Sequence, residues 1–131
     1  MILDTSAIVR AVLREPGYER IFQRMGASPV LAVGGPTLVE AAMVLSSKVG
    51  RDSRAQLSRF LREADVQVIP FTAEHYEVAV DAFQRYGKGR HAAALNFGDC
   101  LTYAVARLSG LPLLYTGDDF SRTDLSAATH P

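Results

Sequence analysis

The chain has almost no cysteine, no net charge and no long apolar run. Its single cysteine, Cys100, excludes an internal disulfide and fits a reducing compartment, and no Cys/His set has the spacing of a zinc site. No stretch reaches the roughly 20 apolar residues that a membrane-spanning helix needs. Because the sequence begins directly with Met-Ile-Leu-Asp, we expect no signal peptide. These absences predict a cytoplasmic protein without a membrane partner.

What is present is the composition of an ordinary folded domain. The 131 residues are 48% hydrophobic and 21% charged, without a repeat, a low-complexity tract or a dividing linker. We therefore expect one domain over residues 1–131. The 14 basic and 14 acidic residues cancel, so bulk charge is compatible with a polyanionic ligand but does not argue for one.

Short apolar runs alternate with amphipathic helical patterns along the chain. Buried strands are predicted at 1–4, 29–33, 67–70 and 113–115. Helical stripes begin at Tyr18, Leu57 and Tyr76, and the segments 37–48 and 99–108 are apolar almost all round, so both should be buried. This alternation predicts a three-layer α/β/α domain, whose short-stranded and mostly parallel sheet is covered on both faces.

Four acids stand where a strand gives way to a helix or where an apolar helix begins: Asp4, Glu40, Asp99 and Asp118. In an open α/β sheet, ligands bind outside the carboxyl ends of the parallel strands, so these acids are expected to converge there. Their like charges would repel one another unless a cation neutralised them. Each acid also has a simple structural explanation as a helix cap, a first-turn residue or a turn residue. Four such junctions together favour a metal site.

Carboxylate oxygens are the hard ligands that Mg²⁺ and Mn²⁺ prefer. Such an ion lowers the pKa of a bound water and stabilises charge on phosphate oxygens, which indicates phosphate chemistry. Four acids are enough for one ion held directly and a second held through water or substrate. Small polar neighbours are candidates for orienting the carboxylates: Thr5, Ser6, Asn96 and Thr116.

The ordered acidic motifs resemble those of the PIN-domain ribonucleases, and more narrowly those of VapC-type toxins of VapBC toxin–antitoxin pairs. The resemblance runs almost from end to end and is carried by Asp4-Thr5-Ser6-Ala7, Glu40, Asn96-Phe97-Gly98-Asp99-Cys100 and Thr116-Gly117-Asp118-Asp119-Phe120.

This resemblance implies a Mg²⁺- or Mn²⁺-dependent endoribonuclease, a homodimer and inhibition by a cognate VapB-type antitoxin. It also implies roles for the acids. Asp4 and Asp99 resemble the principal metal ligands, and Glu40 resembles the acid that binds the metal or positions the attacking water. Asp118 resembles the fourth acid, although the adjacent Asp119 leaves its register open. A PIN-like domain that processes or only binds RNA, without being a toxin, remains the alternative.

A basic segment that contains two glycines lies a few residues before Asp99. Arg85, Lys88 and Arg90 are candidates for contacts with RNA phosphates, and Tyr86 is a candidate for stacking on an unpaired base. The opposite interpretation is a solvated loop in which Tyr86 completes the preceding apolar stripe.

Other functions fit less well. A phospho-accepting receiver domain needs an acidic pair after its first strand and a late lysine, whereas Ser6 stands near Asp4 and no lysine follows Lys88. Ser6 also occupies the second acidic place of a haloacid-dehalogenase-like phosphatase. The stripes that begin at Tyr18 and Leu57 are further candidates for a dimer or antitoxin groove, with ordinary core packing as the alternative. Cys100 is expected to be a core residue rather than a nucleophile.

Overall fold

A five-stranded parallel sheet forms the centre of the molecule in the computed structural model, which describes residues 1–125 and 127–129. The strand order is β3-β2-β1-β4-β5, and every neighbouring pair is parallel. The strands are β1 (Ile2–Leu3), β2 (Leu31–Gly34), β3 (Val66–Ile69), β4 (Leu113–Leu114) and β5 (Ala127–Thr129). The four predicted strands are confirmed, and β5 was not predicted.

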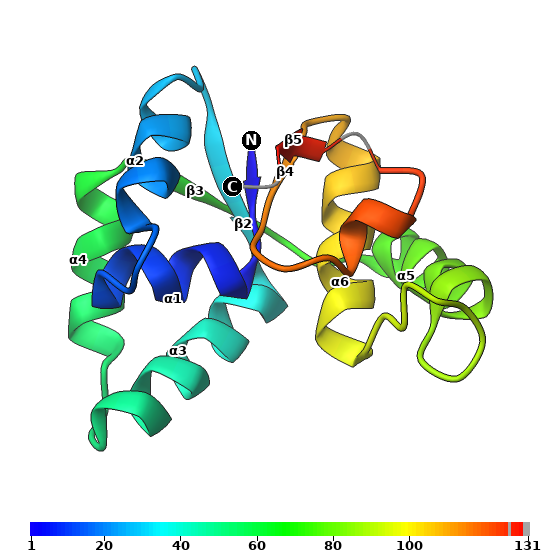
Figure 1. The fold of residues 1–131 in the computed structure, drawn as a ribbon, viewed down its shortest axis with the longest axis horizontal. Helices are drawn as coiled ribbons and strands as arrows, with labels where there is room; N and C mark the ends of the chain where they lie inside the picture. The colour runs from blue at the N-terminus through cyan, green and yellow to red at the C-terminus, as the bar shows by residue number, and fades with distance from the viewer. Residues whose placement is uncertain (126, 130–131) are drawn as a thin grey trace.

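Helices cover both faces of this sheet. They are α1 (Thr5–Leu13), α2 (Tyr18–Gly26), α3 (Gly35–Val49), α4 (Arg54–Glu63), α5 (Ala73–Tyr86) and α6 (Phe97–Ser109), followed by the short 3₁₀ helix η1 (Phe120–Arg122). Figure 1 shows α1 to α4 on one side of the strands and α5 with α6 on the other. The predicted three-layer α/β/α architecture is therefore confirmed.

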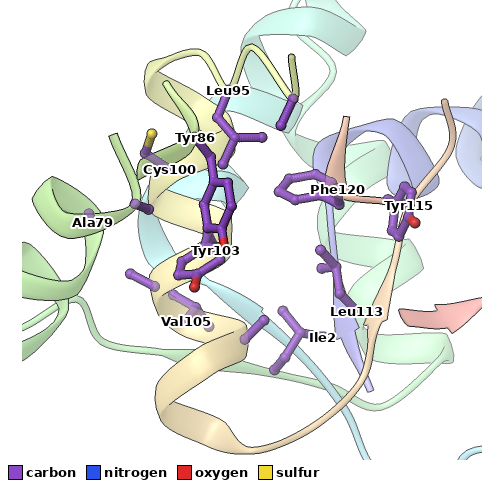
Figure 2. Packing of buried hydrophobic residues seen from close by; sticks show 14 of the residues in the cluster. Ile2, Ala79, Tyr86, Leu95, Cys100, Tyr103, Val105, Leu113, Tyr115 and Phe120 are labelled. Carbon is purple, nitrogen blue, oxygen red and sulfur yellow. The ribbon is translucent and has the colours of Figure 1, made fainter. Parts of the chain in front are cut away.

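Two hydrophobic clusters hold the layers together because the short strands are buried on both faces. Leu3 and Leu114 face the cluster with α1 to α4, whereas Ile2 and Leu113 face the cluster with α5 and α6. The second cluster is drawn in Figure 2, where Tyr103 of α6 lies beside Tyr86 at the end of α5. Successive side chains of β1 and of β4 point to opposite faces of the sheet, so each of these strands contributes one residue to each hydrophobic cluster.

The prediction that both strongly apolar segments are buried is right for α6 and wrong for α3. Residues 102–106 of α6 are all buried. In α3, however, the side chains of Val39 and Met43 are 60% and 66% exposed. Only one side of α3 packs against the sheet and α1, so the opposite side has apolar residues that the described part of this chain does not cover.

Thr37 and Glu40 do not form a capping pair at the start of α3. Helix α3 begins at Gly35, its N-cap is Gly34, and a proline stands in its first turn. Thr37 is instead buried within the helix, and Glu40 lies in its second turn. Among the described residues, no helix is both long and apolar enough to span a membrane.

Candidate functional site

Asp4 lies where β1 ends and α1 begins, at the carboxyl end of the central strand. Its backbone N–H donates to Leu114 O at 3.0 Å, which continues the pairing of β1 with β4. Its carboxylate caps α1 by accepting hydrogen bonds from Ser6 N at 3.1 Å and Ser6 Oγ at 2.6 Å. The residue is only 6% exposed. Burial raises the pKa of Asp4, and the negative charge of Glu40 raises it further, although hydrogen bonds from Ser6 and Thr102 oppose this.

Glu40 reaches this region from α3. Thr5 Oγ1, in the residue after Asp4, donates to Glu40 Oε1 at 2.5 Å. On its other side, the Glu40 carboxylate lies against the backbone of Gly98: a Cβ at that glycine would be 2.3 Å from Glu40 Oε2. Helices α3 and α6 therefore meet at an acid, and the close approach requires a residue without a side chain at position 98.

Asp99 is half-buried in the first turn of α6. It forms a reciprocal capping box with Asn96: Asp99 N donates to Asn96 Oδ1 at 2.9 Å, and Asn96 N donates to Asp99 Oδ2 at 3.0 Å. Burial raises the pKa of Asp99 to about 7, and the negative charges of Asp4, Asp119 and Glu40 contribute to the increase. This environment disfavours the ionised form of the Asp99 carboxyl group unless a positive charge is supplied nearby.

The fourth acid comes from the segment after β4. Gly117 has a φ of +86°, which forms the turn expected here, and Asp118 and Asp119 follow with exposed side chains. Asp119 precedes η1 and is one of the charges that raise the pKa of Asp99, whereas Asp118 acts on Tyr115. The sequence favoured Asp118 for this role. Asp119 thus contributes to the charge around Asp99, and the choice of Asp118 as the fourth acid stays a prediction.

The donor set suits a hard divalent cation, although the side chains do not form a ready-made cage. Within residues 1–125 and 127–129, no group of three or more His, Cys, Asp or Glu side chains is arranged to hold a metal ion. The acids nevertheless influence one another electrostatically across three elements. Each carboxylate is turned to a local donor, because Asp4 accepts from Ser6, Glu40 from Thr5 and Asp99 from Asn96. Binding of a cation would therefore require side-chain rotations.

Small polar residues hydrogen-bond the individual acids. The side chains of Thr5 and Ser6 donate to Glu40 and Asp4, whereas Asn96 donates its backbone N–H to the Asp99 carboxylate. Thr116 acts on Asp4 indirectly: its backbone N–H donates to Ser6 Oγ at 3.0 Å, and Ser6 Oγ donates to the Asp4 carboxylate. Sequence reasoning missed Thr102, which lowers the pKa of Asp4, and Thr37, whose hydroxyl lies 3.0 Å from that of Thr102. In the sequence, Thr102 stands one helical turn after Asp99 and Thr37 one helical turn before Glu40. That spacing was the signal from which both threonines could have been predicted to lie near the site.

The basic segment before α6 forms a loop that packs back on α5. Tyr86 is buried, hydrogen-bonded through its hydroxyl to Arg85, and in ring contact with Tyr103 (Figure 2), so its predicted stacking on a base is wrong. Arg85 also faces Asp124 at 3.5 Å. Lys88 and Arg90 remain exposed, with the guanidinium of Arg90 lying 4.9 Å from the centre of the Phe83 ring.

Cys100 follows Asp99 but has no nucleophilic character. It is buried in the cluster between the sheet, α5 and α6 (Figure 2). Burial, with a contribution from the charge of Asp99, raises the pKa of its thiol to about 11. The thiol is therefore protonated at neutral pH, as expected for a core residue.

The described residues form two hollows with apolar side chains in their lining, and one of them adjoins Glu40. The α2–α4 groove has a volume of about 590 Å³ and is lined by Val12, Phe22, Met25 and Phe60, with Arg14 and Arg59 among its charged residues. The α3–α6 surface encloses about 660 Å³ and is lined by Val39, Met43, Phe71, Phe97 and Leu101, beside Glu40. Phe97 is 80% exposed, although it stands only two residues before Asp99.

Known proteins share both the sequence and the fold of this chain. The family model described as PIN domain matches residues 1–125. Ribonuclease VapC36 of Mycobacterium tuberculosis is 46% identical over 128 residues, covering 95% of this chain and 91% of that protein. A Ribonuclease VapC of Mycolicibacterium smegmatis is 39% identical over 127 residues, covering 97% of this chain and 98% of that protein.

Solved structures agree in fold. The crystal structure of Mycobacterium tuberculosis VapC20, described as a sarcin–ricin loop cleaving toxin, superposes with a TM-score of 0.80 at 20% identity and covers 99% of this chain and 98% of that one. A toxin–antitoxin complex from Klebsiella pneumoniae superposes with a TM-score of 0.69 at 21% identity and covers 99% of this chain and 98% of that one.

Proposed function

Since this chain belongs to the PIN-domain family, among relatives named Ribonuclease VapC, we propose that it is a Mg²⁺- or Mn²⁺-dependent endoribonuclease and the toxin of a type II toxin–antitoxin pair. The strongest support is the convergence of acids from separate elements. Asp4 follows β1, Glu40 lies on α3 and Asp99 lies in the first turn of α6. Burial raises the pKa of Asp99 to about 7, and repulsion by the charges of Asp4 and Glu40 adds to the increase. A cation is the simplest ligand that would relieve this repulsion.

Asp4 and Asp99 are the principal ligands of the cation in this proposal. Glu40 is a further ligand or the group that orients water, and Asp118 or Asp119 acts from the outer side. When bound, the cation supplies positive charge that lowers the pKa of water and stabilises the charge that develops on phosphate oxygens. Carboxylate oxygens are the donors that Mg²⁺ and Mn²⁺ favour, and Mg²⁺ needs only one or two of them.

The residues of the chain then hold and move protons. Thr5 fixes one oxygen of Glu40 by its hydrogen bond. The other oxygen accepts a proton from the water as the bond from that water to phosphorus forms and the bond from phosphorus to the 3′-oxygen breaks, and the departing 3′-oxygen takes a proton from solvent. The products are a 5′-phosphate and a 3′-hydroxyl. Lys88 and Arg90, both exposed on the loop before α6, contact RNA phosphates and position the strand. Arg85 has a smaller part, because it is already paired with Asp124.

The α2–α4 groove is the docking site for a VapB-type antitoxin in this proposal. Its apolar side chains, which include Phe22 and Phe60, suit the hydrophobic side of an antitoxin helix, and Arg14 offers a partner for an acidic residue of that helix. The groove contains side chains from both stripes that the sequence marked as candidates for an interface. Phe22 belongs to the stripe that begins at Tyr18, and Phe60 to the stripe that begins at Leu57.

The α3–α6 surface is where two copies pair in this proposal. Val39, Met43 and Phe97 together expose more apolar area than single scattered side chains do, as expected of an interface. The surface adjoins Glu40, so pairing would place the two acidic sites near one another. A monomer in light scattering at micromolar concentration would contradict this part.

Cleavage of RNA is the direct test. The purified protein with Mg²⁺ or Mn²⁺ should cut structured RNA, and sequencing of the ends should identify a 5′-phosphate at each cut. Asp4→Asn and Asp99→Asn should abolish cleavage while the fold stays intact, whereas Asp81→Asn, on the exposed side of α5, should not. Cleavage by the Asp99→Asn variant that resists a chelator would contradict the mechanism. RNA binding without cleavage in the unaltered protein would favour the non-catalytic alternative.

A further inference from the structure

The segment that carries Asp118 and Asp119 is fastened to the rest of the molecule on both sides of these acids. Before them, the backbone N–H of Thr116 donates to Ser6 Oγ at 3.0 Å, in the first turn of α1. After them, the carboxylate of Asp124 contacts α5 and α6. The two acids therefore lie between one anchor on α1 and a second anchor on α5 and α6.

Asp124 forms the second anchor with both of its carboxylate oxygens. Tyr103 of α6 donates its hydroxyl proton to Oδ1 at 2.5 Å, a length typical of a strong hydrogen bond to an ionised carboxylate. Arg85 of α5 and Arg107 of α6 approach Oδ2, with Nη1 at 3.5 Å and 3.4 Å. Because both arginine side chains are more than half exposed, their ion pairs contribute little. The hydrogen bond from Tyr103 is therefore the main contact.

The protonation states of these groups fix the direction of the hydrogen bond. Burial raises the pKa of the Tyr103 hydroxyl, and the hydrogen bond to Asp124 raises it further, so the phenol keeps its proton. For Asp124, burial acts to raise the pKa, but the hydrogen bond from Tyr103 and the positive charges of Arg107 and Arg85 lower it on balance. The carboxylate is therefore ionised at neutral pH and can only accept.

Tyr103 links this anchor to the helix that bears Asp99. It stands four residues after Asp99 in α6, so the two side chains lie on the same side of the helix, one turn apart. Tyr103 is 3% exposed, and it packs in the same hydrophobic cluster as Phe120, the residue after Asp119 (Figure 2). Because its ring is enclosed, Tyr103 holds Asp124 at a fixed place relative to α6.

The backbone between the acids and Asp124 is internally hydrogen-bonded. Ser121 donates to Asp118 O through its N–H at 3.1 Å and through its hydroxyl at 2.6 Å. Thr123 donates to Phe120 O in the same way, at 3.1 Å and 2.7 Å. These bonds close η1 and the turn after it, so a displacement of Asp124 would move Asp118 as well.

We propose that Tyr103 and Asp124 are positioning residues, which hold the segment 116–125 so that its acid reaches the metal site. This inference rests on the proposed function, because it takes Asp118 or Asp119 as the fourth acid. Residues that orient a metal ligand commonly change metal affinity by about 10-fold to 100-fold when they are altered. A tie with only a structural role would lower stability without changing metal affinity.

The test is a calorimetric titration of the full chain with Mn²⁺, without RNA, supported by thermal unfolding. Tyr103→Phe removes only the hydroxyl and should weaken Mn²⁺ binding by about 10-fold. The Asp118→Asn/Asp119→Asn variant lacks the acids that the tie positions. In that background Tyr103→Phe should add nothing, because the tie acts only through those acids.

Thr72→Val is the control for general destabilisation. Thr72 contacts His75 at the start of α5, so its loss should lower the melting temperature without changing Mn²⁺ affinity. Unchanged affinity in a folded Tyr103→Phe variant would overturn the inference while leaving the proposed function intact. A further 10-fold loss when Tyr103→Phe is added to the variant without both acids would overturn it too. If Tyr103→Phe does not fold, Asp124→Ala, which removes the acceptor, decides by the same criteria. An unaltered protein that binds no Mn²⁺ overturns the proposed function, and with it this inference.

Discussion

The carboxylate of Glu40 lies against the backbone of Gly98, so closely that a Cβ at position 98 would be 2.3 Å from Glu40 Oε2. This contact joins α3 to the first turn of α6, directly before Asp99. Because the end of a long side chain can move at little cost, a side chain at position 98 should displace Glu40 rather than unfold the protein.

Gly98→Ala should therefore lower RNA cleavage by about 10-fold or more, with a small effect on the melting temperature, because Glu40 can no longer keep its position. The measurement is the initial cleavage rate at saturating Mg²⁺. Gly26→Ala is the matched control, since a Cβ there would meet no atom within 4 Å. Equal rates for both variants would show that the position of Glu40 does not matter.

The identity of the fourth acid can be decided by two single substitutions. Asp119 is one of the charges that raise the pKa of Asp99, so Asp119→Asn should weaken Mn²⁺ binding more than Asp118→Asn does. Both side chains are exposed, which makes a change in folding a poor explanation for any difference. The ratio of the two Mn²⁺ dissociation constants is the measurement. A larger effect of Asp118→Asn would restore the assignment made from the sequence.

Stability without metal should depend on pH through Asp99. Burial, together with the neighbouring acids, raises its pKa from 3.8 to about 7, so the folded state holds the proton more tightly than the unfolded state does. The stability that protonation contributes is complete below pH 3.8 and is lost as pH rises through about 7. Burial raises the pKa of Asp4 too, which acts in the same direction.

Urea unfolding across this pH range, with a chelator present, is the measurement. Relative to the unaltered protein, Asp99→Asn should gain stability as pH increases, because asparagine has no proton to lose. Excess Mn²⁺ at pH 7.5 should remove most of the difference by stabilising the ionised acid of the unaltered protein. A stability difference that does not vary with pH would contradict the assigned pKa.

The sequence predicted the main features of the fold because they are local. Runs such as Ile2–Leu3 and Leu31–Gly34 are apolar over their whole length, which marks them as buried parallel strands. β5 contains Ala127–Thr129, with no large apolar residue to mark it as a strand. The exposure of Met43 was not foreseeable, since an apolar helix has the same sequence whether this chain or a partner covers it.

The site was predictable where residues stand at the ends of elements and was missed where tertiary contacts decide. Asp4 and Asp99 were recognisable from the strand and helix boundaries. Thr102 was not, because its contact with Thr37 joins residues on two different helices that only the fold brings together. Tyr86 fitted both a stacking role and a core role in the sequence, and only its packing against Tyr103 decides for the core.

The α2–α4 groove makes a prediction that is independent of catalysis. Phe22→Glu should weaken binding of the cognate VapB-type antitoxin by about 30-fold, the effect of a strong interface residue, without lowering RNA cleavage by the free toxin. Tyr76→Glu is the control, because Tyr76 is exposed on α5, in the opposite layer of the molecule (Figure 1). Antitoxin affinity that falls equally in both variants would argue against the groove.

The central claim is that Asp4 and Asp99 share one divalent cation, and a titration of Mn²⁺ into the unaltered protein, Asp4→Asn, Asp99→Asn and Asp81→Asn tests it most directly. The account predicts saturable binding at micromolar to millimolar Mn²⁺ in the unaltered protein and in Asp81→Asn, and loss of that binding in both Asp4→Asn and Asp99→Asn, with each variant still folded. Binding of Mn²⁺ with unchanged affinity in folded Asp4→Asn or Asp99→Asn would contradict it.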